Sequence, residues 1–186
     1  MSHAEHFESL EKQAHAARLG MWVFLGSEIL LFGALFGLYA SYRAHYPAEL
    51  HEAMHHSEKV LGSLNTAILL GSSALVAASV EMLRADRRGL ARLLLAGTML
   101  LGLVFLLVKG LEYRSHVTAG FTPTSGEFWS LYYTMTGLHA VHVLIGIAVL
   151  SLMLFDLVPH RLEVGALYWH FVDIVWIFLW PLFYLA

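Results

Sequence analysis

The chain has no cysteine, only four prolines and few charged side chains, and each shortage excludes a class of protein. Without cysteine there is no disulfide framework, thiolate metal site or redox dithiol, so any metal would need histidine and carboxylate ligands. Eleven lysines and arginines stand against 14 acidic residues, which gives no basic surface for nucleic acid. No P-loop, G-x-G-x-x-G, G-x-S-x-G or C-x-x-C motif occurs, so we predict that the chain itself is not catalytic.

Apolar residues are what the sequence has in abundance. They make up 58% of the 186 residues, and the mean hydropathy is +0.64, well above that of soluble globular domains. The sequence therefore predicts a polytopic membrane protein with no nucleic-acid partner. We expect residues 1–17 to form a polar cytoplasmic segment and residues 18–186 a single membrane domain. Its fold class is all-α, a bundle of five transmembrane helices at about 18–43, 59–83, 91–113, 128–155 and 164–186.

The orientation of the bundle follows from its basic residues. Arg84, Arg87, Arg88 and Arg92 crowd into the short turn between the second and third spans. Five spans put the two termini on opposite sides, and seven basic residues share the side of the N-terminus against four on the other. By the positive-inside rule the N-terminus is predicted inside and the C-terminus outside.

The first span carries a carboxylate inside an apolar run. Glu28 lies about nine residues into the stretch from Gly20 to Tyr42, at a depth where an acid costs on the order of 3 kcal/mol or more. At 100° per residue, three glycines fall on the opposite face of the helix: Gly26, Gly33 and Gly37. We expect the glycine face to pack closely on another helix and Glu28 to face a cleft, a second helix or lipid.

Counting residues from the cytoplasmic ends places several ionisable side chains in one layer of the membrane. The layer holds Glu28, His139, His142, His170 and Asp173. His139 and His142 share a face, as do His170 and Asp173, so we expect the latter two to titrate together. Three interpretations stay open: a hydrogen-bond network between helices, a path for protons or ions, or a metal or haem site.

Other polar residues lie toward the outer end, where we expect water to reach them: Asn65, Lys109 and Glu112. Lys109 and Glu112, three residues apart, are predicted to form a helix-end ion pair worth a few tenths of a kcal/mol. Four histidines gather in the first outer loop, at positions 45, 51, 55 and 56, with either a metal site or a solvated loop as the interpretation. Three tryptophans at positions 169, 176 and 180 form one aromatic face for packing or interface anchoring.

Five stretches, one in each span, resemble a known family. They are GMWVFLGSEILLF around Glu28, LNTAILLGSSALV from Leu64, GLEY from Gly110, TGLHAVHVLIG from Thr136 and YWHFVDIVWIFLW from Tyr168. Together they resemble the cytochrome c oxidase subunit III family, the third subunit of the haem-copper terminal oxidases, in its short five-helix form. The last two stretches are the most specific, because they fix histidine, acid and tryptophan at several offsets at once.

The resemblance implies an accessory subunit without a redox centre in a bacterial plasma membrane. It would pack against catalytic subunit I and a copper-binding subunit II of a proton-pumping cytochrome c oxidase, with haem and copper held in those partners. Glu28 would face a lipid-containing cleft near the proton entrance of subunit I, with structural phospholipid beside it. His139, His142, His170, Asp173 and Glu112 would be structural polar residues of the family.

Alternatives to this interpretation remain at the level of the sequence. Within the family, the chain could serve a quinol oxidase or be a homologue associated with nitric oxide reductase. From a different class, it could be a small ion or metal transporter that uses Glu28, His142 and Asp173. The chain also lacks the two N-terminal helices of larger family members, which leaves part of the lipid cleft open or completed by another subunit.

Overall fold

The computed structural model describes residues 10–54 and 59–184 of the chain. Within these residues all regular structure is helical, and five of the helices are long and apolar enough to cross a membrane. The all-α bundle of five spans is thus confirmed. The helices are α1 (Leu10–His45), α2 (Pro47–Met54), α3 (Lys59–Arg84), α4 (Arg88–Thr118), α5 (Glu127–Phe155) and α6 (Pro159–Tyr184).

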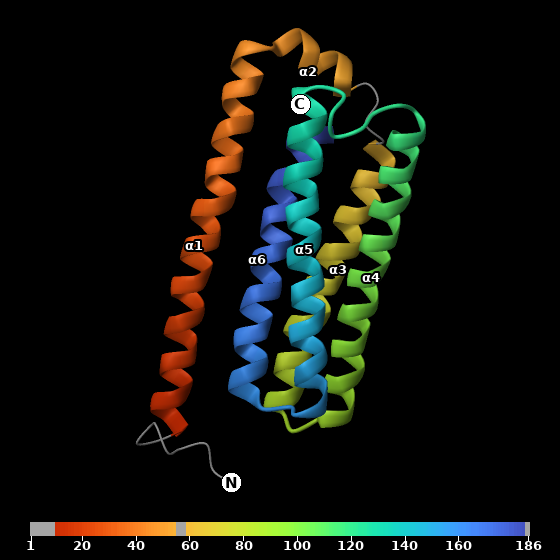
Figure 1. Cartoon of the computed structure of the whole chain (residues 1–186). Coiled ribbons are helices and arrows are strands. Elements are labelled where there is room, and N and C mark those ends of the chain that lie inside the picture. The colour runs from red at the N-terminus through yellow and green to blue at the C-terminus, as the bar shows by residue number, and fades with distance from the viewer. Residues whose placement is uncertain (1–9, 55–58, 185–186) are drawn as a thin grey trace.

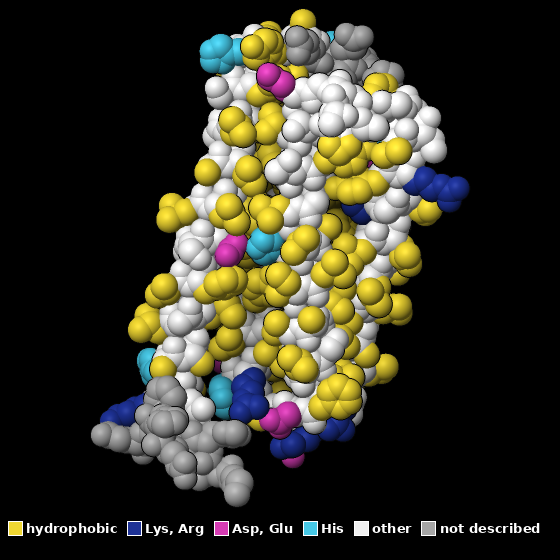
Figure 2. Space-filling view, viewed as in Figure 1, with side chains coloured by type: hydrophobic (Ala, Val, Ile, Leu, Met, Phe, Trp, Pro, Cys, Tyr) yellow, Lys and Arg dark blue, Asp and Glu magenta, His cyan; other side chains and the backbone are white. Residues whose placement is uncertain are grey.

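Helices α3 to α6 form a four-helix bundle, and α1 lies along one side of it (Figure 1). The closest pair is α3 with α4, whereas α1 contacts chiefly α6 and, less extensively, α5. The short helix α2 crosses one end of the molecule, here named the α2 end. The opposite end contains the turn between α3 and α4 with Arg84, Arg87 and Arg88, and is named the arginine end. On the face shown in Figure 2, apolar side chains cover the middle and charged side chains gather at the arginine end.

The helices run further than the predicted spans. The first begins by Leu10 instead of residue 18, and the fourth helix continues to Thr118 instead of residue 113. Part of the expected outer loop is the helix α2, and α6 starts at Pro159 instead of residue 164. Hydropathy marks where a helix is apolar, not where its backbone hydrogen bonds end. Proline is well suited to the first position of a helix, which is where both Pro47 and Pro159 lie.

Serine side chains of α3 help to hold α3, α4 and α6 together. The hydroxyl of Ser79 on α3 donates a hydrogen bond to the Ala91 carbonyl on α4 (2.8 Å). Ser72 accepts one from the indole Nε1 of Trp169 on α6 (3.0 Å). Trp169 and Trp176 are both buried, so this part of the aromatic face serves packing.

The glycine face of α1 does not pack within the described chain. A Cβ placed on Gly26, Gly33 or Gly37 would meet no atom within 4 Å, so this face is open in the described chain and its close packing on another helix stays a prediction. Aromatic pairs hold α1 against α6 instead, for example Phe32 with Phe171 at 6.2 Å between ring centroids. Large rings keep the two backbones apart, and the glycines therefore remain beside open space.

Candidate functional site

Glu28 forms an ion pair or hydrogen bond with His142 at the contact between α1 and α5. Its Oε2 lies 3.0 Å from Nε2 of His142. Glu28 is 18 residues from the first residue of α1 and 17 from the last, so the pair is near mid-membrane. The glutamate side chain is 15% exposed and the imidazole 9%, and Phe32 packs edge-on against the histidine ring at 5.2 Å. The pair is therefore largely shielded.

The contact made by Nδ1 of His142 shows where the imidazole carries its hydrogens. Nδ1 lies 2.8 Å from the Leu138 carbonyl, which can only accept, so Nδ1 carries a hydrogen. The contact between Nε2 and Glu28 must then hold one more proton, either on the carboxyl group or on the imidazole. Both forms are neutral overall, which makes the pair tolerable in a low-dielectric region. The arrangement can thus hold a proton that moves between two atoms.

The other members of the predicted layer do not join this pair. A ring nitrogen of His170 on α6 lies 2.7 Å from the Ser73 hydroxyl on α3, and the structure describes no direct bond from His170 to Asp173, so their common titration stays a prediction. The carboxylate of Asp173 is buried and has no hydrogen-bond partner among the described residues. His139 is fully buried between Phe105 and Trp176. Each side chain turns toward the helix that packs against it.

A second polar cluster lies toward the α2 end, and it corrects the prediction for Lys109 and Glu112. Both side chains are buried, at 3% and 0% exposure, so they are not a water-exposed helix-end pair. Nζ of Lys109 donates to Glu112 (3.1 Å), Tyr132 (2.8 Å) and Tyr184 (2.6 Å), which uses all three ammonium hydrogens. Both tyrosine hydroxyls in turn donate to Oε1 of Glu112, at 2.6 and 2.5 Å. Asn65, expected at the same wet level, is buried too.

This closed network ties three helices together, because Lys109 and Glu112 are on α4, Tyr132 on α5 and Tyr184 at the end of α6. Aromatic rings surround the ammonium group, the nearest being that of Tyr132 at 4.7 Å from Nζ. Cations are attracted to aromatic faces when water is excluded. The cluster is saturated with hydrogen bonds, and its geometry indicates a lock for the C-terminal end of α6.

An apolar cleft of about 480 Å³ lies between α1 and α6. Its walls include Phe32 and Gly33 of α1 and Phe171 of α6, and Glu28 is not among its lining residues. A second pocket of about 550 Å³ adjoins it at the arginine end and shares Trp22, Leu167 and His170 with it. There Arg84 and Arg18 both approach Glu163, at 2.9 and 3.6 Å.

Comparison with known proteins shows the family of the chain. The family model described as "Cytochrome c oxidase subunit III" matches residues 3–186. The chain belongs to the cytochrome c oxidase subunit III family. It is similar to "Probable quinol oxidase subunit 3" of Staphylococcus haemolyticus (strain JCSC1435), with 31% identity over all of this chain and 96% of the relative. The proteins of the same name from Staphylococcus epidermidis (strain ATCC 35984) and Staphylococcus aureus (strain USA300) are 30% and 29% identical over the same shares.

This subunit III is accordingly part of a haem-copper oxidase and a multi-pass protein of the bacterial plasma membrane. Its quoted family stretches meet in space: the one around Glu28 contacts the one that holds His142. The stretch from Tyr168 contributes Tyr168 itself, whose hydroxyl donates to the His142 carbonyl at 3.1 Å.

The histidine-rich loop of this subunit III shows no metal site in its described part. Nowhere in residues 10–54 and 59–184 do three histidine, aspartate or glutamate side chains gather as metal ligands would. His45 uses Nδ1 to bond the Ser41 carbonyl (2.8 Å). His55 and His56 lie outside the described residues.

Sequence reasoning missed Tyr132 and Tyr184 as partners of Lys109 and Glu112. The error came from the predicted end of the third span. Because α4 continues to Thr118, Glu112 lies six residues inside the helix and Lys109 nine. Two opposite charges on one face at that depth, with tyrosines in neighbouring spans, were the signal that could have revealed the cluster.

Proposed function

We propose that this chain is the accessory subunit III of a quinol oxidase, in place of the cytochrome c oxidase expected from the sequence. The observation that carries the choice of donor is the name shared by the relatives, which cover all of this chain. Haem and copper would be held by the partner subunits, subunit I above all. A quinol delivers its electrons from within the bilayer, so subunit II of such a complex needs no copper centre for a soluble cytochrome.

The donor can be tested by isolating the complex from native membranes through a tag on this chain. We expect a haem spectrum in the purified material and oxygen uptake driven by a reduced short-chain quinol. Oxygen uptake driven by reduced cytochrome c, with none from quinol, would contradict the choice of donor. Material without any haem would contradict membership of the complex itself.

We infer further that the pair of Glu28 and His142 assists proton uptake by subunit I. The support is its mid-membrane position and its shared proton, since Nδ1 of His142 is committed to a carbonyl. A group that binds and releases a proton inside the membrane can supply that proton to subunit I when the proton concentration in the surrounding water is low. A permanently charged group cannot do so. On this proposal the pair buffers protons for the neighbouring subunit and is not a path of its own.

Replacing Glu28 with glutamine should therefore slow turnover or shorten the active lifetime while leaving assembly intact. The glutamine amide can still donate to Nε2 of His142, so packing is kept, but the exchangeable proton is lost. If the loss of the proton raises the barrier of the rate-limiting step by about 1 kcal/mol, the rate falls about fivefold. The effect should grow with pH, and oxygen uptake and proton release by the reconstituted complex would measure it.

The control is Asp156→Asn, which removes an exposed carboxylate that lines neither the cleft nor the second pocket. It should leave rate and lifetime unchanged at every pH. If Glu28→Gln behaves like this control from mildly acidic to alkaline conditions, Glu28 is a packing residue and the proton role is wrong.

The two adjoining pockets between α1, α3 and α6 suit the structural phospholipid that the family resemblance implies. The cleft is lined mostly by apolar side chains, as an acyl chain requires, and Arg18 and Arg84 line the adjoining pocket, where a phosphate would lie. Glu163 already holds both arginines near each other. We propose that these two pockets are the binding site of an anionic lipid that helps to keep α1 against the bundle.

A further inference from the structure

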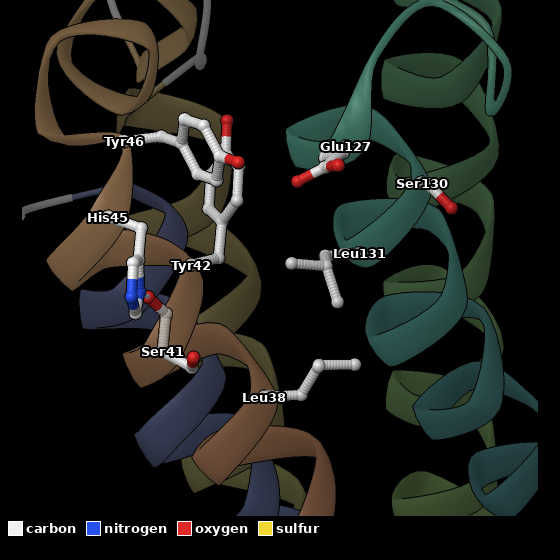
Figure 3. A pocket seen from close by; sticks show the side chains of 8 residues that line it. All are labelled: Leu38, Ser41, Tyr42, His45, Tyr46, Glu127, Ser130 and Leu131. Atoms are coloured by element: carbon white, nitrogen blue, oxygen red, sulfur yellow. Dashed lines mark hydrogen bonds between the residues drawn. The ribbon is translucent and has the colours of Figure 1, made fainter.

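Helix α1 contacts α5 less extensively than it contacts α6, although the pair of Glu28 and His142 joins α1 to α5. Toward the α2 end a third pocket, of about 490 Å³, lies between α1 and α5, with Leu38 on one side and Leu131 on the other (Figure 3). The two helices are therefore not held together there. The bond between Glu28 and His142 depends on how α1 and α5 are fixed near the middle of the spans.

Tyr168 of α6 lies beside the pair and contacts both of these helices. Its ring packs against Phe24 of α1, with 6.0 Å between the ring centroids, and Phe24 is one helical turn before Glu28. Its hydroxyl donates a hydrogen bond to the carbonyl of His142 on α5 (3.1 Å). The side chain is only 3% exposed. One buried residue of α6 thus links the two helices that carry the pair.

Gly146 lets the ring of Tyr168 approach α5 closely. It is one helical turn after His142, and a Cβ on it would lie 3.3 Å from Cε1 of Tyr168. The His142 carbonyl lies inside α5, where the regular helical bond takes only one of its two lone pairs. The tyrosine hydroxyl is an additional donor to this carbonyl. A phenylalanine could supply the same packing, so the hydroxyl specifically contributes the link between α6 and α5.

Other titratable side chains of the neighbouring elements bond or pack elsewhere. On α1 no other titratable residue lies within one turn of Glu28. On α5 His139 packs between two aromatic rings, and on α6 His170 bonds a serine of α3. On α4 Lys109 and Glu112 belong to their own closed network. The hydroxyl of Tyr168 is therefore the polar group of α6 that acts on the pair.

We propose that Tyr168 is a positioning residue for the proton shared by Glu28 and His142, an inference that rests on the proposed proton role of this pair. Through Phe24 and the His142 carbonyl, Tyr168 keeps α1 and α5 at the spacing that places Oε2 and Nε2 3.0 Å apart. At this distance the proton is bonded to both groups. At a larger distance this bond weakens, and so does the repulsion between the carboxylate and the bare nitrogen after the proton has left. Both changes make the pair release its proton at a lower pH.

Tyr168→Phe tests the proposal, because it removes the hydroxyl and keeps the ring. As the pH rises, oxygen uptake by the reconstituted complex should begin to fall about half a pH unit lower than in the wild type. This shift corresponds to about threefold weaker binding of the shared proton, the scale of one lost hydrogen bond. The matched control is Tyr133→Phe, which removes a hydroxyl that donates to the Phe121 carbonyl (2.9 Å) nearer the α2 end. It should leave the pH profile unchanged.

Thermal unfolding in mild detergent provides a second measurement, which does not depend on the proton role. Glu28→Leu removes the bond to His142, so Tyr168→Phe should cost less in that background. The double variant should lose about 2 °C less in Tm than the sum of the two single losses, whereas Tyr133→Phe with Glu28→Leu should be additive.

Two results would overturn the positioning role. One is additive losses for Tyr168→Phe and Glu28→Leu. The other is a wild-type pH profile in Tyr168→Phe when Glu28→Gln alters the profile. If Glu28→Gln itself leaves the profile unchanged, the proton role of the pair is wrong, and the additivity of the unfolding losses alone decides whether Tyr168 positions the pair.

Discussion

Replacing Glu112 with leucine should destabilise the subunit by about 3–5 kcal/mol, because it leaves a buried ammonium group without its carboxylate. Lys109 and Glu112 are both almost inaccessible, so water cannot substitute for the missing partner. The double variant Lys109→Met with Glu112→Leu removes both charges and should recover much of the loss. About 1–2 kcal/mol should remain, since the Tyr132 and Tyr184 hydroxyls lose their acceptor. The midpoint of thermal unfolding in mild detergent would measure all three proteins.

A surface pair provides the comparison for this experiment. Asp156 and Arg161 lie 2.8 Å apart with side chains 66% and 43% exposed, so Asp156→Asn should cost less than about 1 kcal/mol. If Glu112→Leu proves as mild as Asp156→Asn, water reaches the cluster and the description of a buried lock is wrong. If the double variant is no more stable than Glu112→Leu, the charge pair is not the source of the stability that the cluster gives.

The fold could be predicted from the sequence because the membrane leaves few choices. Runs of about 20 apolar residues must become helices there, since every backbone polar group needs a partner inside the segment. Glu28 and His142 could likewise be recognised, because ionisable residues at that depth are costly and stand out. Neither inference needs knowledge of how the helices face one another.

What could not be predicted is the rotation of each helix about its axis. Counting residues gives the height of a side chain in the membrane but not its direction. The side chains predicted to share one layer therefore belong to several unconnected sites in the structure. His170 bonds Ser73 on α3, while His142 bonds Glu28 on α1. The glycine face of α1 shows the same limit, since small residues permit close packing but phenylalanines such as Phe32 set the actual distance to α6.

Alanine in place of Gly102 or Gly146 should destabilise the bundle by about 1–3 kcal/mol each, through overpacking against one tryptophan. A Cβ on Gly102 of α4 would lie 2.7 Å from Cη2 of Trp169, and a Cβ on Gly146 of α5 would lie 2.8 Å from its Cε3. The indole cannot turn aside cheaply, because it is fully buried and its Nε1 donates to Ser72 on α3. Thermal unfolding midpoints and the amount of chain in the membrane fraction would show the loss.

Both helices contain a glycine that serves as a matched control. A Cβ on Gly110 of α4 meets no described atom within 4 Å, and one on Gly137 of α5 has its nearest contact at 3.9 Å, so alanine should be tolerated at either site. Because Gly102 and Gly146 touch the same ring, their double variant should depart from additivity, as residues that share a partner do. If Gly102→Ala and Gly146→Ala are as stable as Gly110→Ala and Gly137→Ala, then Trp169 is not clamped between α4 and α5. The order of stability among these four variants thus measures how tightly one side chain of α6 holds the bundle together.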